Sequence, residues 1–222
     1  TAVGNQMRGV LLEHGIALAQ GDAALSHGVP RVLEDTHTRI PDLLHELIAE
    51  LLAEWEHLGE RIERLNGTLH SQARQDPTAR RLMTVRGYGA VIATALVAKQ
   101  SEPERFPNAR QFAAYFGTVP DQKSSGEKTR LGKMSKRGDG YLRSMVIEGA
   151  HAVLRHVAPD SQQPDDRRLL RWMQRHGRKG AAIRLANRNL RIAWVLLQND
   201  QVYRRQPNPQ QANASEERAM HH

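Results

Sequence analysis

Cysteine is absent from the 222 residues, which excludes disulfide bonds, thiolate zinc sites and cysteine nucleophiles. Aromatic residues make up only 5% of the chain, so its core has to be built mainly from aliphatic side chains. The longest apolar run, residues 90–98, is far shorter than the roughly 20 residues that cross a bilayer. The first residues lack a basic segment followed by an apolar one, so we expect no secretory signal. We therefore predict a cytoplasmic protein of one or two domains, with no membrane partner.

Charge is distributed unevenly along the chain, whose formal net charge is +8. Residues 1–79 carry a net charge of −6, whereas residues 80–143 carry +8 and residues 160–205 carry +7. Two strongly basic segments indicate a polyanionic partner, most simply nucleic acid. The alternative is a solvated surface that happens to be rich in arginine.

The clearest periodicity predicts a long helix within residues 31–79. Apolar residues alternate at spacings of four and three over residues 43–69, as in a coiled-coil seam. These are Leu44, Ile48, Leu51, Trp55, Leu58, Ile62, Leu65 and Leu69. The seam could join two chains, giving a homo-oligomer through residues 43–69, or it could pack inside one chain. Asp76 and Pro77 are predicted to end the helix.

The rest of the chain also favours helices, and the fold class we predict is mainly α. The expected form is a coiled-coil-like helix followed by a small helical domain. We predict further helices at 1–18, 90–99, from Asn108, at 141–156, at 169–175 and at 181–198. Residues 118–139 are predicted to be a polar loop, and residues 206–222 a disordered tail. The sequence shows no convincing strand pattern.

Gly87 and Gly89 frame a predicted tight turn before the small-residue helix at residue 90. Glycines let backbone N–H groups approach a phosphate, and the following helix N-terminus adds a favourable dipole. The pattern is similar to a helix-hairpin-helix, which binds the DNA backbone without reading its sequence. The alternative is a plain turn between two helices that binds nothing.

The segment 122–139 is the richest in groups that could contact phosphate. It holds six cations and three serines within eighteen residues, and cations with hydroxyls and backbone N–H groups can hold phosphates. The candidate contacts are Lys123, Lys128, Arg130, Lys133, Ser135, Lys136 and Arg137. A serine among these cations could also attack phosphorus, although no base is apparent nearby. The alternative is a flexible basic loop. No metal-ligand cluster is apparent in the sequence.

Several stretches occurring in order resemble a known family. They are residues 85–89, 105–120, 124–139 and 141–143, followed by Arg191-Ile192-Ala193-Trp194. Together they resemble the C-terminal domain of insertion-sequence transposases that pair an acidic, resolvase-like (DEDD) domain with a serine-containing domain. These proteins are also called bridge-RNA-guided recombinases. The resemblance covers about residues 82–198, and residues 5–11 are similar to the family's helix after the acidic domain.

The resemblance implies roles for particular residues. Ser125 matches the family's nucleophile, with Ser124 as the alternative. Residues 85–89 match an Ile-Pro-Gly-Ile-Gly turn, but Arg86 stands where the family has proline. The family's acidic metal ligands lie upstream of the matched part, so we expect Mg²⁺ in a missing domain and no cofactor in this chain.

The resemblance also implies an organisation and a function. Residues 1–30 would end the upstream catalytic domain, 31–79 would form the coiled-coil linker, and 80–205 the serine transposase domain. The chain would be a transposase fragment that binds element DNA, and a structured element RNA in parts of the family, and takes part in strand cleavage and rejoining. Alone, it is expected to be inactive. The alternative is a non-enzymatic basic nucleic-acid-binding module or an inactive remnant.

Overall fold

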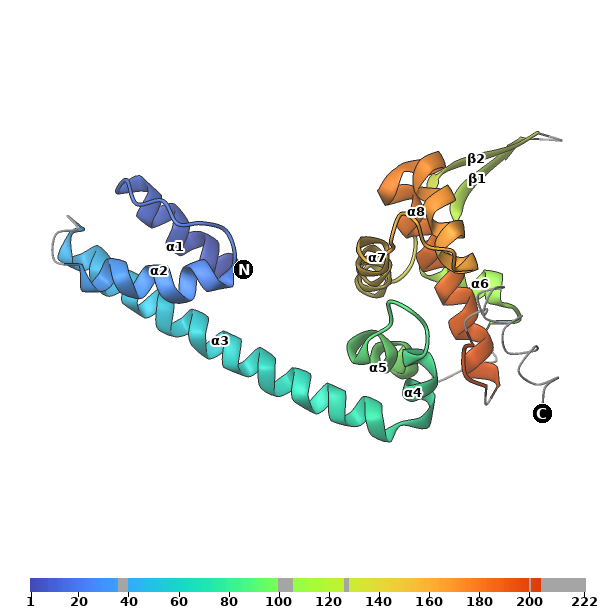
Figure 1. The fold of residues 1–222 in the computed structure, drawn as a ribbon, viewed down its shortest axis with the longest axis horizontal. Helices are drawn as coiled ribbons and strands as arrows, with labels where there is room; N and C mark the ends of the chain where they lie inside the picture. The colour runs from blue at the N-terminus through green and yellow to red at the C-terminus, as the bar shows by residue number, and fades with distance from the viewer. Residues whose placement is uncertain (36–39, 100–105, 126–127, 200, 205–222) are drawn as a thin grey trace. The chain divides into compact units, whose positions relative to one another are not determined.

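The computed structural model describes residues 1–35, 40–99, 106–125, 128–199 and 201–204 (Figure 1). The described chain is mainly helical, as predicted, and it divides into two compact units, Thr1–Thr68 and Leu69–His222. The elements in order are α1 (Ala2–Glu13), α2 (Asp22–Glu34), α3 (Asp42–Gln75), α4 (Pro77–Met83), α5 (Ala90–Lys99), α6 (Ala109–Tyr115), β1 (Pro120–Ser125), β2 (Lys128–Met134), α7 (Gly140–Arg155) and α8 (Pro164–Gln198). None of the helices in these described ranges is both long enough and apolar enough to cross a bilayer.

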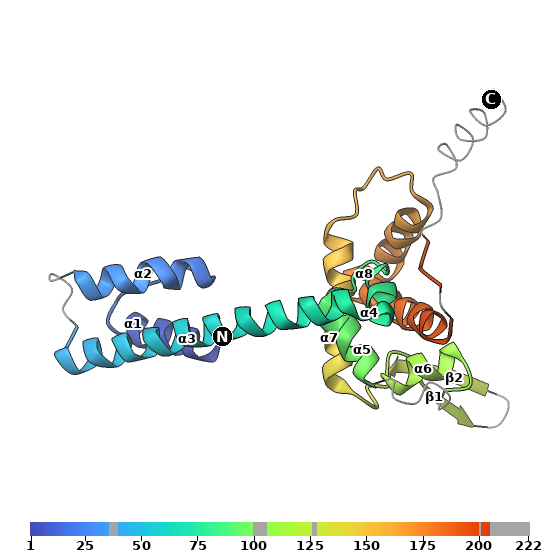
Figure 2. The same cartoon turned by 90° about the horizontal axis from the view of Figure 1, so that it is seen from below.

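The first unit packs α1 and α2 beside the beginning of α3 (Figure 2). Its core consists of six buried aliphatic side chains, two from each helix: Met7, Leu11, Leu25, Val29, Ile48 and Leu51. The predicted seam is therefore divided along its length. Ile48 and Leu51 are buried within the unit, whereas Leu58, Ile62 and Leu65 are 38%, 57% and 56% exposed.

The end of α3 lies where the sequence predicted it. The Asp76 carboxylate accepts hydrogen bonds from the amides of Thr78 (2.7 Å) and Ala79 (3.1 Å), so it caps α4. Pro77 occupies the first turn of α4, where its missing N–H costs no hydrogen bond. The chain therefore leaves α3 at Gln75 and starts a new helix two residues later.

The second unit surrounds one aliphatic core. In it, α7 packs on α8, α6 packs on α8, and α5 packs on α4 and α7. The two helices predicted at 169–175 and 181–198 are both present, joined into the one element α8. Gly177 interrupts that element with non-helical backbone angles, φ 66° and ψ 172°. After this kink, small and aliphatic residues such as Ala186, Leu190 and Ala193 face the core.

The prediction of a polar loop without strands at residues 118–139 was wrong, because β1 and β2 form an antiparallel hairpin there. The two strands contain few β-branched or aromatic residues, so neither shows a strand signal by itself. Pairing lets the backbone N–H and C=O groups of each segment bond to the other strand instead of to water.

Candidate nucleic-acid interface

Both candidate serines lie at the end of β1, and their backbone is paired with cation-bearing β2. The register sets Ser125 opposite Lys128, Ser124 opposite Thr129, and Lys123 opposite Arg130. Lys133 lies further along β2. The hairpin thus brings together backbone positions that the sequence had assigned to the nucleophile and to phosphate contacts. Residues 126–127, which join the strands, lie outside the described residues.

The base of the hairpin is fixed by a close crossing of two backbone segments. A Cβ on Gly138 would overlap the Tyr115 carbonyl oxygen, and one on Gly117 would overlap the Arg137 carbonyl oxygen. Both glycines have positive φ, 65° for Gly117 and 87° for Gly138. Arg143 of α7 donates to the carbonyl oxygens of Phe116 (3.2 Å) and Arg137 (3.3 Å), which holds the crossing together.

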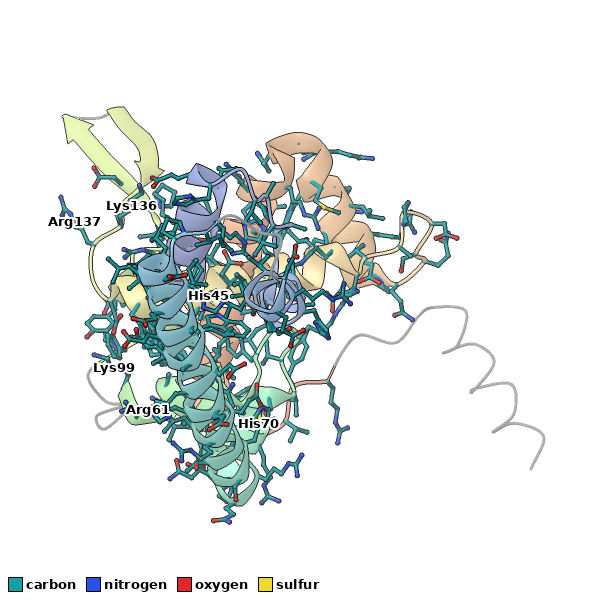
Figure 3. The ribbon with its side chains drawn as sticks, turned by 90° about the vertical axis from the view of Figure 1, so that its left-hand side faces the viewer. His45, Arg61, His70, Lys99, Lys136 and Arg137 are labelled. Atoms are coloured by element: carbon teal, nitrogen blue, oxygen red, sulfur yellow. The ribbon has the colours of Figure 1, made fainter. Side chains whose placement is uncertain are left out.

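The segment after β2 divides its residues between structure and solvent. The Ser135 amide donates to the Val119 carbonyl oxygen at 2.9 Å, so its backbone continues the close approach. Lys136 and Arg137 are exposed (Figure 3), and with the described residues Arg137 makes one long ion pair, 4.0 Å from Asp121. These two cations are therefore available to an external phosphate.

Asp139 begins α7 and joins it to α5. Its carboxylate accepts the Leu142 amide at 3.0 Å and lies 3.2 Å from Lys99 Nζ. The hydrogen bond from the Leu142 N–H lowers the pKa of Asp139 below its ordinary value, and the Lys99 ammonium adds a smaller effect in the same direction. Partial burial acts in the opposite direction but does not outweigh them. Asp139 therefore stays ionised as a helix cap, and its role in this motif is structural.

The Gly87–Gly89 turn links α4 to α5, and its two glycines have different surroundings. Gly87 has φ 89°, and a Cβ on it would lie 2.6 Å from the Gly149 carbonyl oxygen of α7. Gly89 is exposed, and a Cβ there would meet no atom within 4 Å. Close packing on α7 thus explains Gly87, whereas phosphate contact by this turn stays a prediction.

Arg86, which departs from the family's turn, ties the turn to α8. Its guanidinium pairs with the buried Asp166 carboxylate, and Asn189 donates to the Arg86 carbonyl oxygen at 2.9 Å. Ser161 also donates to Asp166, at 2.8 Å. Arg86 therefore anchors the turn to α8 through both its side chain and its backbone.

Asp165, the neighbour of Asp166, holds a second set of cations. Its buried carboxylate lies 3.3 Å from Arg168 and 3.1 Å from Arg188. The Tyr203 hydroxyl donates to the same carboxylate at 3.2 Å and accepts from Arg188 at 3.3 Å. These contacts fix two arginines of α8 at the edge of a groove.

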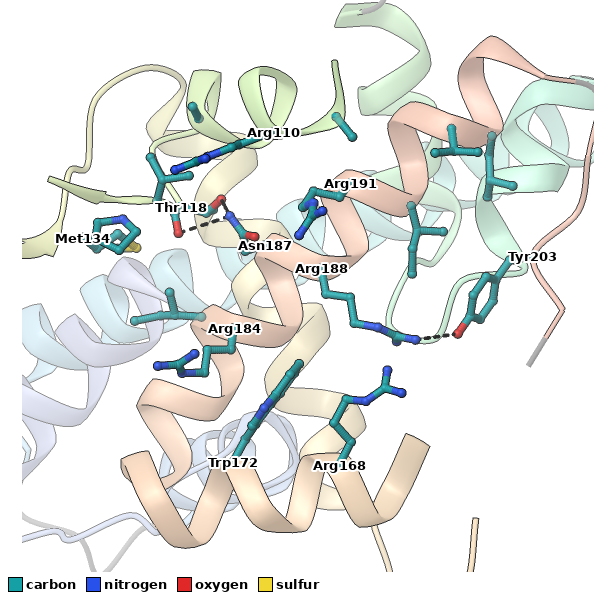
Figure 4. Close-up of a pocket in the computed structure, with 18 of the residues that line it drawn as sticks. Arg110, Thr118, Met134, Arg168, Trp172, Arg184, Asn187, Arg188, Arg191 and Tyr203 are labelled. Atoms are coloured by element: carbon teal, nitrogen blue, oxygen red, sulfur yellow. Dashed lines mark hydrogen bonds between the residues drawn. The ribbon is translucent and has the colours of Figure 1, made fainter. Parts of the chain in front are cut away.

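The groove, which we call the α6–α8 groove, has a volume of about 1320 Å³ (Figure 4). Helix α6, the base of the hairpin, α8 and residues 201–204 line it. Six arginines are among the described residues of its lining, and no carboxylate is: Arg110, Arg168, Arg184, Arg188, Arg191 and Arg204. Sequence reasoning found the basic segment 160–205 but none of these as sites. The sequence did contain a signal for this site. Arg184, Arg188 and Arg191 are spaced four and three residues apart, which places them on one face of a helix.

Metal ligands do not gather in the described ranges. No three His, Asp or Glu side chains of those ranges form a group that could hold an ion. Asp165 and Asp166 are instead committed to arginine partners. The described residues therefore do not fit a Mg²⁺ site.

Residues 79–165 match the family described as "Transposase IS116/IS110/IS902 family". A "Probable family 20 transposase" of Pseudomonas aeruginosa is 40% identical over 92% of the chain and 60% of its own length. "Transposase for insertion sequence element IS1111A" of Coxiella burnetii is 34% identical over 92% of the chain and 56% of its own length. The Yersinia enterocolitica "Transposase for insertion sequence element IS1328" is 33% identical over 90% of the chain and 58% of its length. The chain thus spans little more than half the length of these relatives.

Proposed function

We propose that this chain is the DNA-binding and strand-transfer part of an insertion-sequence transposase. The observation that carries the proposal is its similarity, over about nine-tenths of its length, to proteins named as transposases. The fold is compatible with this role, since the candidate nucleophile lies on a hairpin within the basic segment 80–143 of the second unit. Activity of a whole transposase would also need the length of the relatives that this chain does not match.

The proposed chemistry is a serine exchange at phosphorus. The Ser125 hydroxyl oxygen attacks a DNA phosphodiester and forms a new O–P bond, while the bond from phosphorus to the leaving deoxyribose oxygen breaks. The proton lost by the serine is balanced by the proton that the leaving oxygen takes up. A second deoxyribose hydroxyl reverses the step and rejoins the strands. Cations of the hairpin stabilise the charge on the phosphoryl oxygens.

The remaining parts of the proposal follow the family resemblance. The acidic domain that would bind Mg²⁺ lies outside this chain, and that ion would activate hydroxyls and stabilise phosphoryl charge. The Leu58–Leu65 part of α3 would join protomers, since strand exchange needs more than one active site. A structured RNA of the element is a second proposed partner. The chain alone is expected to bind DNA without cutting it.

A covalent-adduct assay tests this function. The chain is joined to the part of the Pseudomonas aeruginosa relative that it does not match and incubated with Mg²⁺ and labelled element-end DNA. We expect an adduct that survives SDS and disappears in Ser125→Ala. Ser144→Ala is the matched control, because Ser144 is an exposed serine of α7 whose hydroxyl donates within its own helix, to the Tyr141 carbonyl oxygen.

The variants also separate the alternatives. Loss of the adduct in Ser124→Ala but not in Ser125→Ala moves the nucleophile by one residue. An adduct that persists in the double variant contradicts the serine mechanism. Salt-sensitive DNA binding without any adduct in the chimera supports the non-enzymatic module instead.

A further inference from the structure

The α6–α8 groove has the charge of a site for a phosphate backbone. Arg184, Arg188 and Arg191 follow one face of α8, and Arg110 extends from α6 on the other side (Figure 4). Arg110, Arg184 and Arg191 are exposed and make no ion pair or hydrogen bond with another described residue. Exposed arginine side chains repel each other because all are positively charged, unless an anion neutralises them. The groove therefore has three uncommitted cations around one space.

The same groove offers apolar and aromatic surface that a phosphate alone would not use. Trp172 and Tyr203 line it together with aliphatic side chains such as Ile183, Ile192 and Val195. Proteins that bind unpaired strands combine a positive groove for the backbone with aromatic rings on which bases stack. In a duplex the base faces are covered by their neighbours, so only an unpaired strand can use both features.

We propose that the α6–α8 groove binds a short stretch of unpaired DNA. Arg184 and Arg191 contact its phosphates, and Trp172 contacts a base face. Asp165 is a positioning residue, since it holds Arg168 and Arg188 at the groove edge. Strand exchange exposes unpaired DNA, so the choice of this ligand rests on the proposed function.

DNA is favoured over RNA by the polar groups of the lining. A 2′-hydroxyl is recognised through an acceptor as well as a donor. The six arginines can only donate. The Asn187 amide N–H₂ is already bonded to the Thr118 hydroxyl at 3.1 Å, and that hydroxyl donates to the Ala113 carbonyl oxygen at 3.0 Å. The described lining thus offers six arginines to phosphates, against a smaller set of side-chain acceptors for a ribose hydroxyl that includes Asn187, Gln201 and His176.

Fluorescence anisotropy with a labelled 12-nucleotide DNA strand tests the proposal on the full chain. We expect Arg184→Ala/Arg191→Ala to weaken strand binding about tenfold and to lower the salt slope by about 1.4. The matched control is Arg175→Ala/Arg178→Ala, which removes the same charge from exposed residues of the same helix that do not line the groove. Trp172→Leu is expected to weaken binding about tenfold through lost stacking, and Trp172→Phe much less.

The outcomes separate this site from the proposed function. An equal loss of strand affinity in Arg184→Ala/Arg191→Ala and in Arg175→Ala/Arg178→Ala would overturn the groove site, because only the total charge of the chain would then matter. Tighter binding of an RNA strand of the same sequence would overturn the assignment to DNA. The Arg184→Ala/Arg191→Ala variant could bind both duplex element DNA and unpaired DNA as tightly as the parent does. In that case the groove proposal fails and the proposed function stands. Circular dichroism on each variant confirms that the fold is retained.

Discussion

At the scale of single residues, three positions within the predicted phosphate-binding segments have structural explanations. Gly87 and Gly138 let backbones approach closely, and Asp139 caps α7. Such residues define the fold of the hairpin and turn, and thereby position the neighbours that face solvent. Among the cations of segment 122–139 whose side chains the structure describes, Lys136 and Arg137 are exposed.

The two glycines of the α4–α5 turn should respond differently to alanine. Gly87→Ala adds a methyl group against the Gly149 carbonyl oxygen at positive φ, so we expect a loss of about 2 kcal/mol in the free energy of unfolding. Gly89→Ala should be nearly neutral in urea unfolding, because its Cβ meets open space. Equal effects of the two changes would refute the packing explanation. Weaker DNA binding by stable Gly89→Ala would support the predicted phosphate contact.

The Asp139 cap predicts a defined pH dependence. Because the folded-state pKa of Asp139 lies below its ordinary value, its stabilisation is present above about pH 4 and is lost as pH falls through the lowered pKa. Asp139→Ala should cost about 1 kcal/mol at pH 7 in thermal unfolding. The difference in stability between Asp139→Ala and the parent should become smaller below pH 4. Asp139→Asn keeps a capping oxygen and should lose less stability than Asp139→Ala. A stability difference between Asp139→Ala and the parent that does not change with pH would contradict the role of the ionised cap.

At the scale of elements, α3 shows both what periodicity reveals and what it leaves open. The seam predicted a long helix, and α3 runs from Asp42 to Gln75. Periodicity alone could not say which partner covers the apolar side. In the structure α1 and α2 cover Ile48 and Leu51, whereas Leu58, Ile62 and Leu65 stay exposed.

Self-association is expected to depend on the exposed half of the seam. Ile62→Asp/Leu65→Asp should shift the protein to monomer in analytical ultracentrifugation, because two charges would then lie in the apolar contact. Folding should be retained, since both side chains are more than half exposed in the single chain. Arg61→Asp, an exposed neighbour outside the seam, serves as the control. A parent that is already monomeric at high concentration would rule out this interface.

The hairpin and the groove could not be predicted with the same success. Residues 120–134 contain Pro, Gly and many charged residues, so their strands depend on pairing with each other rather than on local propensity. The groove needs Arg110 of α6 beside Arg191 of α8, two residues far apart in the sequence. Basic composition indicated the kind of partner, but only tertiary packing defines where it would contact the chain.

At the scale of the whole molecule, charge follows the division of the chain. The acidic excess lies in residues 1–79, which include the first compact unit, and both basic segments lie within the second. The transposase-family match at residues 79–165 also lies in the second unit. We therefore expect the second unit to account for DNA binding.

Duplex DNA binding should weaken steeply with salt, because each neutralised phosphate releases counterions. A plot of log affinity against log salt is expected to be linear. Lys136→Ala/Arg137→Ala should lower its slope by about 1.8 if both exposed cations contact phosphate. An affinity that does not change between low and moderate salt would contradict a phosphate-contacting role.

The most direct test of the account is to identify the amino acid that becomes joined to DNA. The chimera with the unmatched part of the Pseudomonas aeruginosa relative is allowed to react with element-end DNA, digested with nuclease and protease, and analysed by tandem mass spectrometry. The account predicts a nucleotide linked to Ser125. A nucleotide linked to a residue outside the hairpin, or strand exchange at full rate with no linked residue, would contradict it.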